Sequence, residues 1–328
     1  MVTMQSHSKL SPLPEGALQF DLRVPAKVVF GWGKRAGIAD VVKPLGRRAW
    51  LLSGSRTLDS AGIPDQIVKA LTEQGIACQR VSCASREPET RDVDEAVAAI
   101  RPHLQSGDCL VGIGGGSTID LAKAVSGLVT QTAAAPVQDY LEGVGRGLKL
   151  VEPPIPLIAV PTTAGTGTEA TKNAVISSYE PPFKKSLRDD RLVPAAVLID
   201  PELTVSNPER VTAHSGMDAI TQLIESFLTK KATPITKALC LEGLKAALPA
   251  LETAVKEPTN RAAREAMSYA AWLSGVTLAN SGLGLAHGVA AALGVHCRVP
   301  HGLACAGDAR PRDEGQLYGP VQRAGANR

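Results

Sequence analysis

The sequence of 328 residues has few of the features that mark several large classes of protein. Aromatic residues make up 3% of it, and the net charge of +3 comes from dispersed lysines and arginines, so we expect no nucleic-acid partner. No run of about 18 apolar residues predicts a transmembrane helix, and residues 1–16 lack the apolar core of a secretory signal. The six cysteines form no C-x-x-C pair, which favours reduced thiols. These absences predict a cytoplasmic protein without a membrane partner.

The length and the hydrophobic fraction favour a folded globular protein. Hydrophobic residues make up 44% of the chain, enough for a substantial core, and we find neither an internal repeat nor a low-complexity tract. A length of 328 residues predicts one large domain or two ordinary ones.

A glycine turn between a buried strand and a helix is the most informative local feature. An apolar run over 109–113 is followed by Gly114, Gly115 and Gly116, and Ser117 then opens a helix. Glycines let a ligand approach the backbone closely, and the helix start offers free N–H groups to a phosphate. Asp120 is expected to face a ribose or a nicotinamide. The alternative is a structural turn in which Ser117 and Asp120 form a capping box.

Strands and helices alternate before Pro201, whereas only helices are predicted after it. The alternation predicts parallel strands joined by crossover helices, with strands at 19–24, 27–31, 49–53, 77–82, 109–113, 155–160 and 195–200. Helices are predicted between them at 37–45, 63–74, 92–104 and 117–130. The later helices are predicted at 208–214, 218–228, 234–250, 260–280 and 285–293.

We therefore predict an α/β nucleotide-binding domain with a Rossmann-like, mostly parallel sheet over residues 1–203, followed by an all-α domain over 204–306. Such an arrangement places a ligand cleft between the two. Residues 307–328 are rich in Gly, Arg, Pro and Asp without apolar periodicity, and are expected to form an irregular tail or to be out of frame.

A second polar loop follows the predicted strand at 155–160. The hydroxyls of Thr162, Thr163, Thr166 and Thr168, spaced by Gly165 and Gly167, would make a donor-rich rim for ribose and phosphate. The alternative is a helix cap with Glu169 near the helix start.

Carboxylate and imidazole side chains in the helical half suggest a metal site. Asp218 and Gln222 are four residues apart and share one helix face, while His287 and His301 follow later. One carboxylate and two imidazoles can bind a divalent metal ion and leave open positions for a substrate oxygen. Taken singly, each histidine is more often a structural residue.

The motifs as a set resemble the iron-containing (group III) alcohol dehydrogenases, which have a dehydroquinate-synthase-like fold. The resemblance spans about residues 20–306 and includes Phe30-Gly-Trp-Gly, Gly114-Gly-Gly-Ser-Thr-Ile-Asp-Leu-Ala-Lys, Pro161-Thr-Thr-Ala-Gly-Thr-Gly-Thr-Glu, Ile199-Asp-Pro-Glu-Leu, Gly216-Met-Asp-Ala-Ile-Thr-Gln, His287-Gly and Pro300-His-Gly. It implies NAD(P)-dependent interconversion of small alcohols with aldehydes or ketones, assisted by Fe²⁺ or Zn²⁺, and a possible homo-oligomer.

The resemblance also implies a role for individual residues. The glycine turn would hold the diphosphate, Thr162, Thr163 and Thr166 would line the cofactor, and Lys184 would contact the nicotinamide ribose. The alternative for Lys184 is a solvated lysine beside Lys185. Asp218, His287 and His301 occupy three of the four metal-ligand positions, and through the metal they would carry the catalysis.

Several positions depart from the family pattern. The fourth ligand position, usually histidine, is Gln222, whose neutral amide oxygen is a poorer ligand. A histidine that relays protons in some members is Ala291 here. Gly54 and Ser55 stand where an aspartate often selects NAD, which leaves room for NADP. The resemblance ends near Ala306, so we expect the helical domain to be incomplete, with apolar faces exposed.

These departures keep two alternatives open. In the first alternative, the chain is a catalytically inactive remnant that still binds nucleotide. In the second, it is a metal-independent reductase of the same fold, similar to the maleylacetate reductases.

Overall fold

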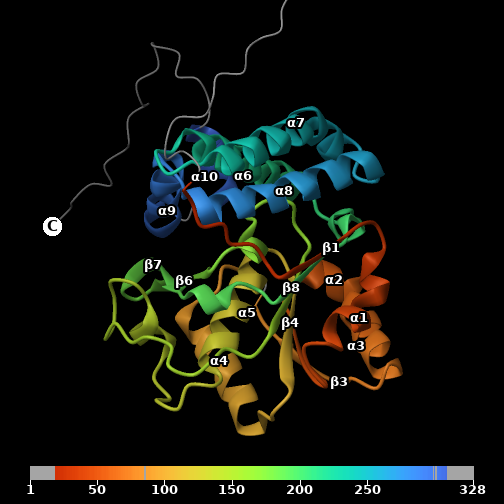
Figure 1. Cartoon of the computed structure of the whole chain (residues 1–328), viewed down its shortest axis with the longest axis vertical. Coiled ribbons are helices and arrows are strands. Elements are labelled where there is room, and N and C mark those ends of the chain that lie inside the picture. Colours follow the sequence, from red (N-terminus) through yellow and green to blue (C-terminus); the bar gives the residue numbers. More distant parts are fainter. Residues whose placement is uncertain (1–18, 85, 298, 300, 309–328) are drawn as a thin grey trace, which may run out of the picture.

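The computed structural model describes residues 19–84, 86–297, 299 and 301–308. Figure 1 shows the helices α6 to α10 gathered at one end of the molecule, above a part that is built from a sheet and its covering helices. This arrangement confirms the prediction of an α/β part followed by an all-helical part. The predicted boundaries of the two domains remain a prediction.

The central sheet has six strands, all parallel. Its strand order is β1-β8-β5-β4-β2-β3. Every residue of β4 is buried, as expected for a central strand that is covered on both faces. The strands are β1 (Lys27–Phe30), β2 (Arg48–Ser53), β3 (Ala77–Ser82), β4 (Asp108–Gly114), β5 (Leu157–Pro161) and β8 (Ala196–Ile199).

Helices cover both faces of this sheet and complete two separate cores. Successive residues of β2 alternate between the faces, so Leu51 packs with α1 (Ile38–Val42) and α3 (Ile63–Glu73). Its neighbours Trp50 and Leu52 pack on the other face with α4 (Thr90–Ile100) and α5 (Gly116–Leu128). The short helix α2 (Arg56–Ser60) follows β2 directly.

Two parts of the strand prediction were wrong. The structure has no strand at 19–24, because the backbone N–H and C=O of Arg23 pair with the side chain of Asn280 on α8 instead of with the sheet. The sequence analysis also missed an antiparallel hairpin of β6 (Asn173–Tyr179) and β7 (Pro182–Arg188). The hairpin lies beside α5, and its strand β7 contacts the helical part (Figure 1).

The helical part consists of α6 (Glu209–Leu228), α7 (Pro234–Lys256), α8 (Arg261–Ser281), α9 (Leu285–Cys297) and α10 (His301–Asp308). Helix α6 is continuous where two helices were predicted, because Gly216 packs closely on Leu251 without ending the helix. Helix α10 was not predicted. Helix α7 leaves Leu241 and Leu248 exposed. Residues 309–328 of the predicted tail lie outside the described residues.

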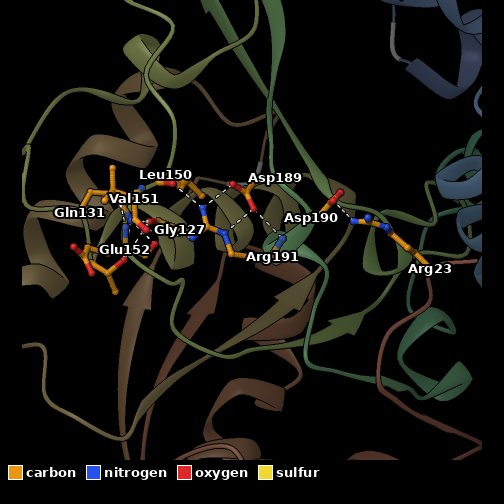
Figure 2. Close-up of polar contacts among 10 residues, drawn as sticks. Arg23, Gly127, Gln131, Leu150, Val151, Glu152, Asp189, Asp190 and Arg191 are labelled. Carbon is orange, nitrogen blue, oxygen red and sulfur yellow. Dashed lines mark hydrogen bonds and ion pairs between the residues drawn. The ribbon is translucent and has the colours of Figure 1, made fainter. Parts of the chain in front are cut away.

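The irregular segment between α5 and β5 is fixed by two side chains. The amide of the buried Gln131 donates to the carbonyls of Gly127 and Glu152 and accepts from the backbone N–H of Val151 (Figure 2). Arg191 donates to the carbonyl of Leu150 at 2.7 Å. These bonds tie the segment to the end of α5 and to the residues before β8.

None of the helices in the described part of the chain has both the length and the apolar composition of a membrane span. Arg261–Ser281 and Leu285–Val295 reach that length and composition only as a pair, and the chain bends by 102° between them.

Candidate active site

A cavity of about 360 Å³ lies where the glycine turn, the β6–β7 hairpin and the helical part meet. Its walls include both α/β and helical residues, and also Ala291 at the position of the absent relay histidine. Nine predicted site residues line it: Gly116, Ser117, Asp120, Thr166, Lys184, Asp218, Gln222, His287 and His301. The other six do not: Gly54, Ser55, Gly114, Gly115, Thr162 and Thr163.

The glycines of the turn make room for the threonine loop. A Cβ atom at Gly115 would lie 3.3 Å from the side chain of Thr163, and one at Gly116 would lie 2.6 Å from Oγ1 of Thr166. Because β4 and β5 are neighbours in the sheet, both loops leave the same edge and pack against each other. The glycines therefore have a packing role in addition to any ligand contact.

The alternative of a capping box at this turn was wrong. Helix α5 begins at Gly116, and its N-cap is Gly115, which has no side chain to offer. The carboxylate of Asp120 instead accepts hydrogen bonds from the hydroxyl of Thr168 and from the backbone N–H of Val175 at 3.2 Å. The N–H groups at the start of α5 thus have no side-chain cap, as an anion site requires.

A buried lysine, Lys123, lies one turn after Asp120 on α5 and balances part of the negative charge of its carboxylate. Lys123 is fully buried, and its ammonium donates to Thr168, Thr171 and the carbonyl of Asn173 at 2.6–2.8 Å. Burial lowers the pKa of Lys123 to about 8, while the nearby carboxylates oppose this shift. Burial likewise raises the pKa of Asp120. The network joins α5 to the threonine loop and to β6, and so fixes one wall of the cavity.

Lys184 and Lys185 lie in different surroundings, although they are adjacent on β7. Lys184 is largely buried, lines the cavity and pairs with Glu87 at 2.8 Å. Lys185 is exposed. The alternative of a solvated surface lysine therefore does not fit Lys184.

The predicted metal ligands come together from three helices. Asp218 on α6 lies 3.1 Å from Nε2 of His287 on α9 and 3.8 Å from Nε2 of His301 on α10. Burial opposes ionisation of Asp218, but the hydrogen bond from His287 and the charges of both histidines hold its pKa below the usual value. Burial lowers the pKa of His301. Burial also opposes protonation of His287, but its hydrogen bonds to Asp218 and Glu225 raise its pKa, so a metal ion would have to displace a proton from His287.

Glu225 belongs to this site and was missed by the sequence analysis. Its Oε2 atom lies 2.6 Å from Nδ1 of His287, and its Oε1 accepts from the backbone N–H of Ala286. The missed signal was its spacing, because residues seven apart share one helix face and place Glu225 two turns beyond Asp218.

Gln222 lines the cavity, but its amide is already in use. Its oxygen accepts a hydrogen bond of 2.7 Å from Ser274, and its nitrogen donates to the carbonyl of Thr166. A metal ion would have to break the bond to Ser274 before it could take this oxygen.

Cys305 is the second residue that the sequence analysis missed. It lies four residues after His301, so both side chains project from one face of α10. One ligand atom from each of Asp218, His287, His301 and Cys305 can be chosen so that all four lie within 4.8 Å of one another. All six cysteines of the chain are free thiols.

The residues predicted to select the cofactor lie beyond the cavity, at the same edge of the sheet. Gly54 and Ser55 directly follow β2, which pairs with β4. A Cβ atom at Gly54 would lie 2.6 Å from the sulfur of Cys83, and Ser55 caps α2 by accepting from the N–H of Leu58. Thr162 is buried, and its carbonyl accepts from Asn207.

Comparison with protein families gives two matches that together cover most of the chain. Residues 25–201 match the model described as iron-containing alcohol dehydrogenase. Residues 212–307 match the model described as the C-terminal part of the Fe-containing alcohol dehydrogenase family.

Individual proteins show the same similarity. The chain is 34% identical to the NAD-dependent methanol dehydrogenase of Bacillus methanolicus over 85% of its own length and 71% of that protein. It is 35% identical to the sulfoacetaldehyde reductase of Bilophila wadsworthia over 85% and 70%. Among solved structures, a 1,3-propanediol oxidoreductase superposes with a TM-score of 0.80 at 31% identity, over 88% of this chain and 73% of that one.

Proposed function

Because this chain belongs to the iron-containing alcohol dehydrogenase family and is an oxidoreductase of alcohols and aldehydes, we propose that the cavity between the glycine turn and α6, α9 and α10 is its active site. The observation that supports this proposal is that Gly116, Asp218 and His287, far apart in the sequence, line one cavity. NAD and a metal ion, typically iron, are the cofactors that the family and the NAD-dependent relatives support.

The α/β side of the cavity would bind the dinucleotide. The uncapped N–H groups at the start of α5 suit the diphosphate, and Lys184, which lines the cavity, would donate to a ribose hydroxyl. Gly54 and Ser55 carry no carboxylate that would repel a 2′-phosphate, and Arg56 follows them. We therefore propose that the chain also accepts NADP.

The helical side would hold the metal through Asp218, His287 and His301. Their donor set suits Fe²⁺ and Zn²⁺, because a buried carboxylate and two imidazoles converge on one point. A divalent ion held there would supply a Lewis acid for the substrate oxygen, and a nicotinamide bound beside it would supply the hydride chemistry. Ala291 has no group that could relay a proton, so a substrate proton would have to leave through water or a ribose hydroxyl.

A nicotinamide absorbance assay tests the proposal. The full chain is incubated with NADH or NADPH and a panel of short aldehydes, and with NAD or NADP and the matching alcohols, with Fe²⁺ or Zn²⁺ added. Turnover that chelation abolishes supports the proposal. Turnover that survives chelation indicates the metal-independent reductase, and folded protein that binds the dinucleotide without turnover indicates the inactive remnant.

Two further predictions concern the protein as a whole. We propose that it forms a homo-oligomer, which light scattering on a sizing column tests, and that it resides in the cytoplasm, which cell fractionation tests.

A further inference from the structure

The position that the family gives to a fourth metal ligand is closed in this chain. Gln222 presents a neutral amide whose oxygen accepts from Ser274 and whose nitrogen donates to Thr166. A metal ion that took this oxygen as a ligand would break the buried hydrogen bond from Ser274, and a neutral amide oxygen is a weak ligand. The three remaining ligands leave an incomplete shell unless another side chain contributes.

Cys305 is the side chain that lies within reach. It is fully buried on α10, its sulfur lies 3.9 Å from Nε2 of His301, and the sulfur lies within 4.8 Å of a carboxylate oxygen of Asp218. Four ligands placed tetrahedrally at 2.0–2.3 Å from a zinc ion lie about 3.3–3.8 Å from one another, and such a site can take a substrate oxygen by expanding to five-coordinate. The ligand atoms of this cluster already lie within 4.8 Å of one another, so small side-chain rotations are enough.

We propose that Cys305 is the fourth protein ligand of the metal, in place of the histidine that Gln222 replaces. The set of Asp218, His287, His301 and Cys305 then contains one soft thiolate, which favours Zn²⁺ over Fe²⁺. Coordination replaces the S–H bond with a metal–sulfur bond and releases one proton to solvent. This inference rests on the proposed function, since it assumes that the other three residues bind the metal.

Cobalt substitution tests the proposal on the whole chain. Metal-free protein is titrated with Co²⁺, because a cobalt–thiolate bond gives a charge-transfer band in the near ultraviolet that carboxylate and imidazole ligands do not give. We expect the band in the wild type and in Cys297→Ser, which removes an exposed thiol on α9. We expect it to be absent in Cys305→Ser. In competition titrations, Cys305→Ser should lose more than about tenfold in Zn²⁺ affinity, the least that losing an outer-shell partner costs.

A second variant separates loss of the ligand from loss of the fold. Adding Gln222→His to Cys305→Ser restores an imidazole, so affinity should return without the charge-transfer band. Bound Co²⁺ without the band in the wild type overturns the role of Cys305 and leaves the three-residue metal site standing. If the wild type binds neither Co²⁺ nor Zn²⁺, the metal site of the proposed function fails together with it. The wild-type spectrum alone decides the matter if Cys305→Ser does not fold.

Discussion

Nδ1 of His287 lies 2.6 Å from Oε2 of Glu225, while Nε2 of the same ring faces Asp218. A carboxylate bonded to the far nitrogen of a ligating histidine fixes its tautomer and its orientation. Glu225 is itself held by the backbone N–H of Ala286 on the helix of His287. The histidine ring is therefore clamped between two carboxylates of α6, and only its Nε2 atom is directed toward the proposed metal.

Replacing Glu225 by glutamine should weaken metal binding without affecting the nucleotide. We expect Glu225→Gln to lose about 10–100-fold in Zn²⁺ affinity, because the neutral amide holds the imidazole less firmly. Competition with a chromogenic chelator measures this loss, and NADH titration should give an unchanged Kd. The control is Glu242→Gln, an exposed change on α7. Equal zinc affinity in both variants would show that Glu225 has no such role.

The two adjacent lysines of β7 offer a matched test of the nucleotide site. Lys184→Ala should raise the KM for NADH by about tenfold, because it removes one charged hydrogen bond worth about 1.5 kcal/mol. The change in kcat should be smaller. Lys185→Ala removes the same charge from an exposed position and should leave both constants unchanged. A fall in kcat alone for Lys184→Ala would contradict a role in nucleotide binding.

The local features of this site were predictable from the sequence, because short stretches encode them. The strand over 109–113, the three glycines and the helix after them are all visible in one short stretch of sequence. The metal-site candidates Asp218, His287 and His301 could be named from residue types and the family resemblance. Their convergence depends on the packing of α6, α9 and α10, which no local pattern encodes.

The residues that were missed acquire their roles only through tertiary contacts. Glu225 matters because α9 brings His287 against it, and Cys305 matters because α10 places its sulfur within 4.8 Å of ligand atoms of Asp218 and His287. The hairpin of β6 and β7 was also missed. Its strands pair chiefly with each other, with Lys184 opposite Ser177. Its strands mix lysines, serines and apolar residues, so neither helical nor strand periodicity stands out.

Cofactor selectivity should change with the charge at Ser55. Asp is as good an N-cap as Ser, so Ser55→Asp keeps the start of α2 while it adds a carboxylate that repels a 2′-phosphate. We expect the ratio of kcat/KM for NADH over NADPH to rise by about tenfold or more, equivalent to about 1.4 kcal/mol. Ser55→Asn keeps the cap without the charge and should leave the ratio unchanged. If both variants behave alike, the 2′-position of the ribose lies elsewhere.

The buried carboxyl of Glu169 should make the stability of the fold depend on pH. Glu169 is buried beside α8, and burial raises its pKa from 4.5 to about 7, although Lys123 opposes this shift. Between pH 4.5 and 7 the folded chain therefore holds a proton that the unfolded chain releases. The contribution of Glu169 to stability is fully present below pH 4.5 and is lost as the pH rises through 7, by up to about 1.4 kcal/mol per pH unit.

Urea unfolding of the metal-free chain at steps from pH 5 to 8 measures this loss. The amide of Glu169→Gln does not ionise, so the free energy of unfolding of the variant should fall less steeply with pH than that of the wild type. Groups common to both chains cancel in the difference, and Glu73→Gln, on the exposed side of α3, controls for the loss of one acidic side chain. Parallel curves for the wild type and Glu169→Gln would mean that the carboxylate is ionised throughout this range. Lys123 would then compensate its charge fully, and the buried network would hold Glu169 and Lys123 as a charged pair.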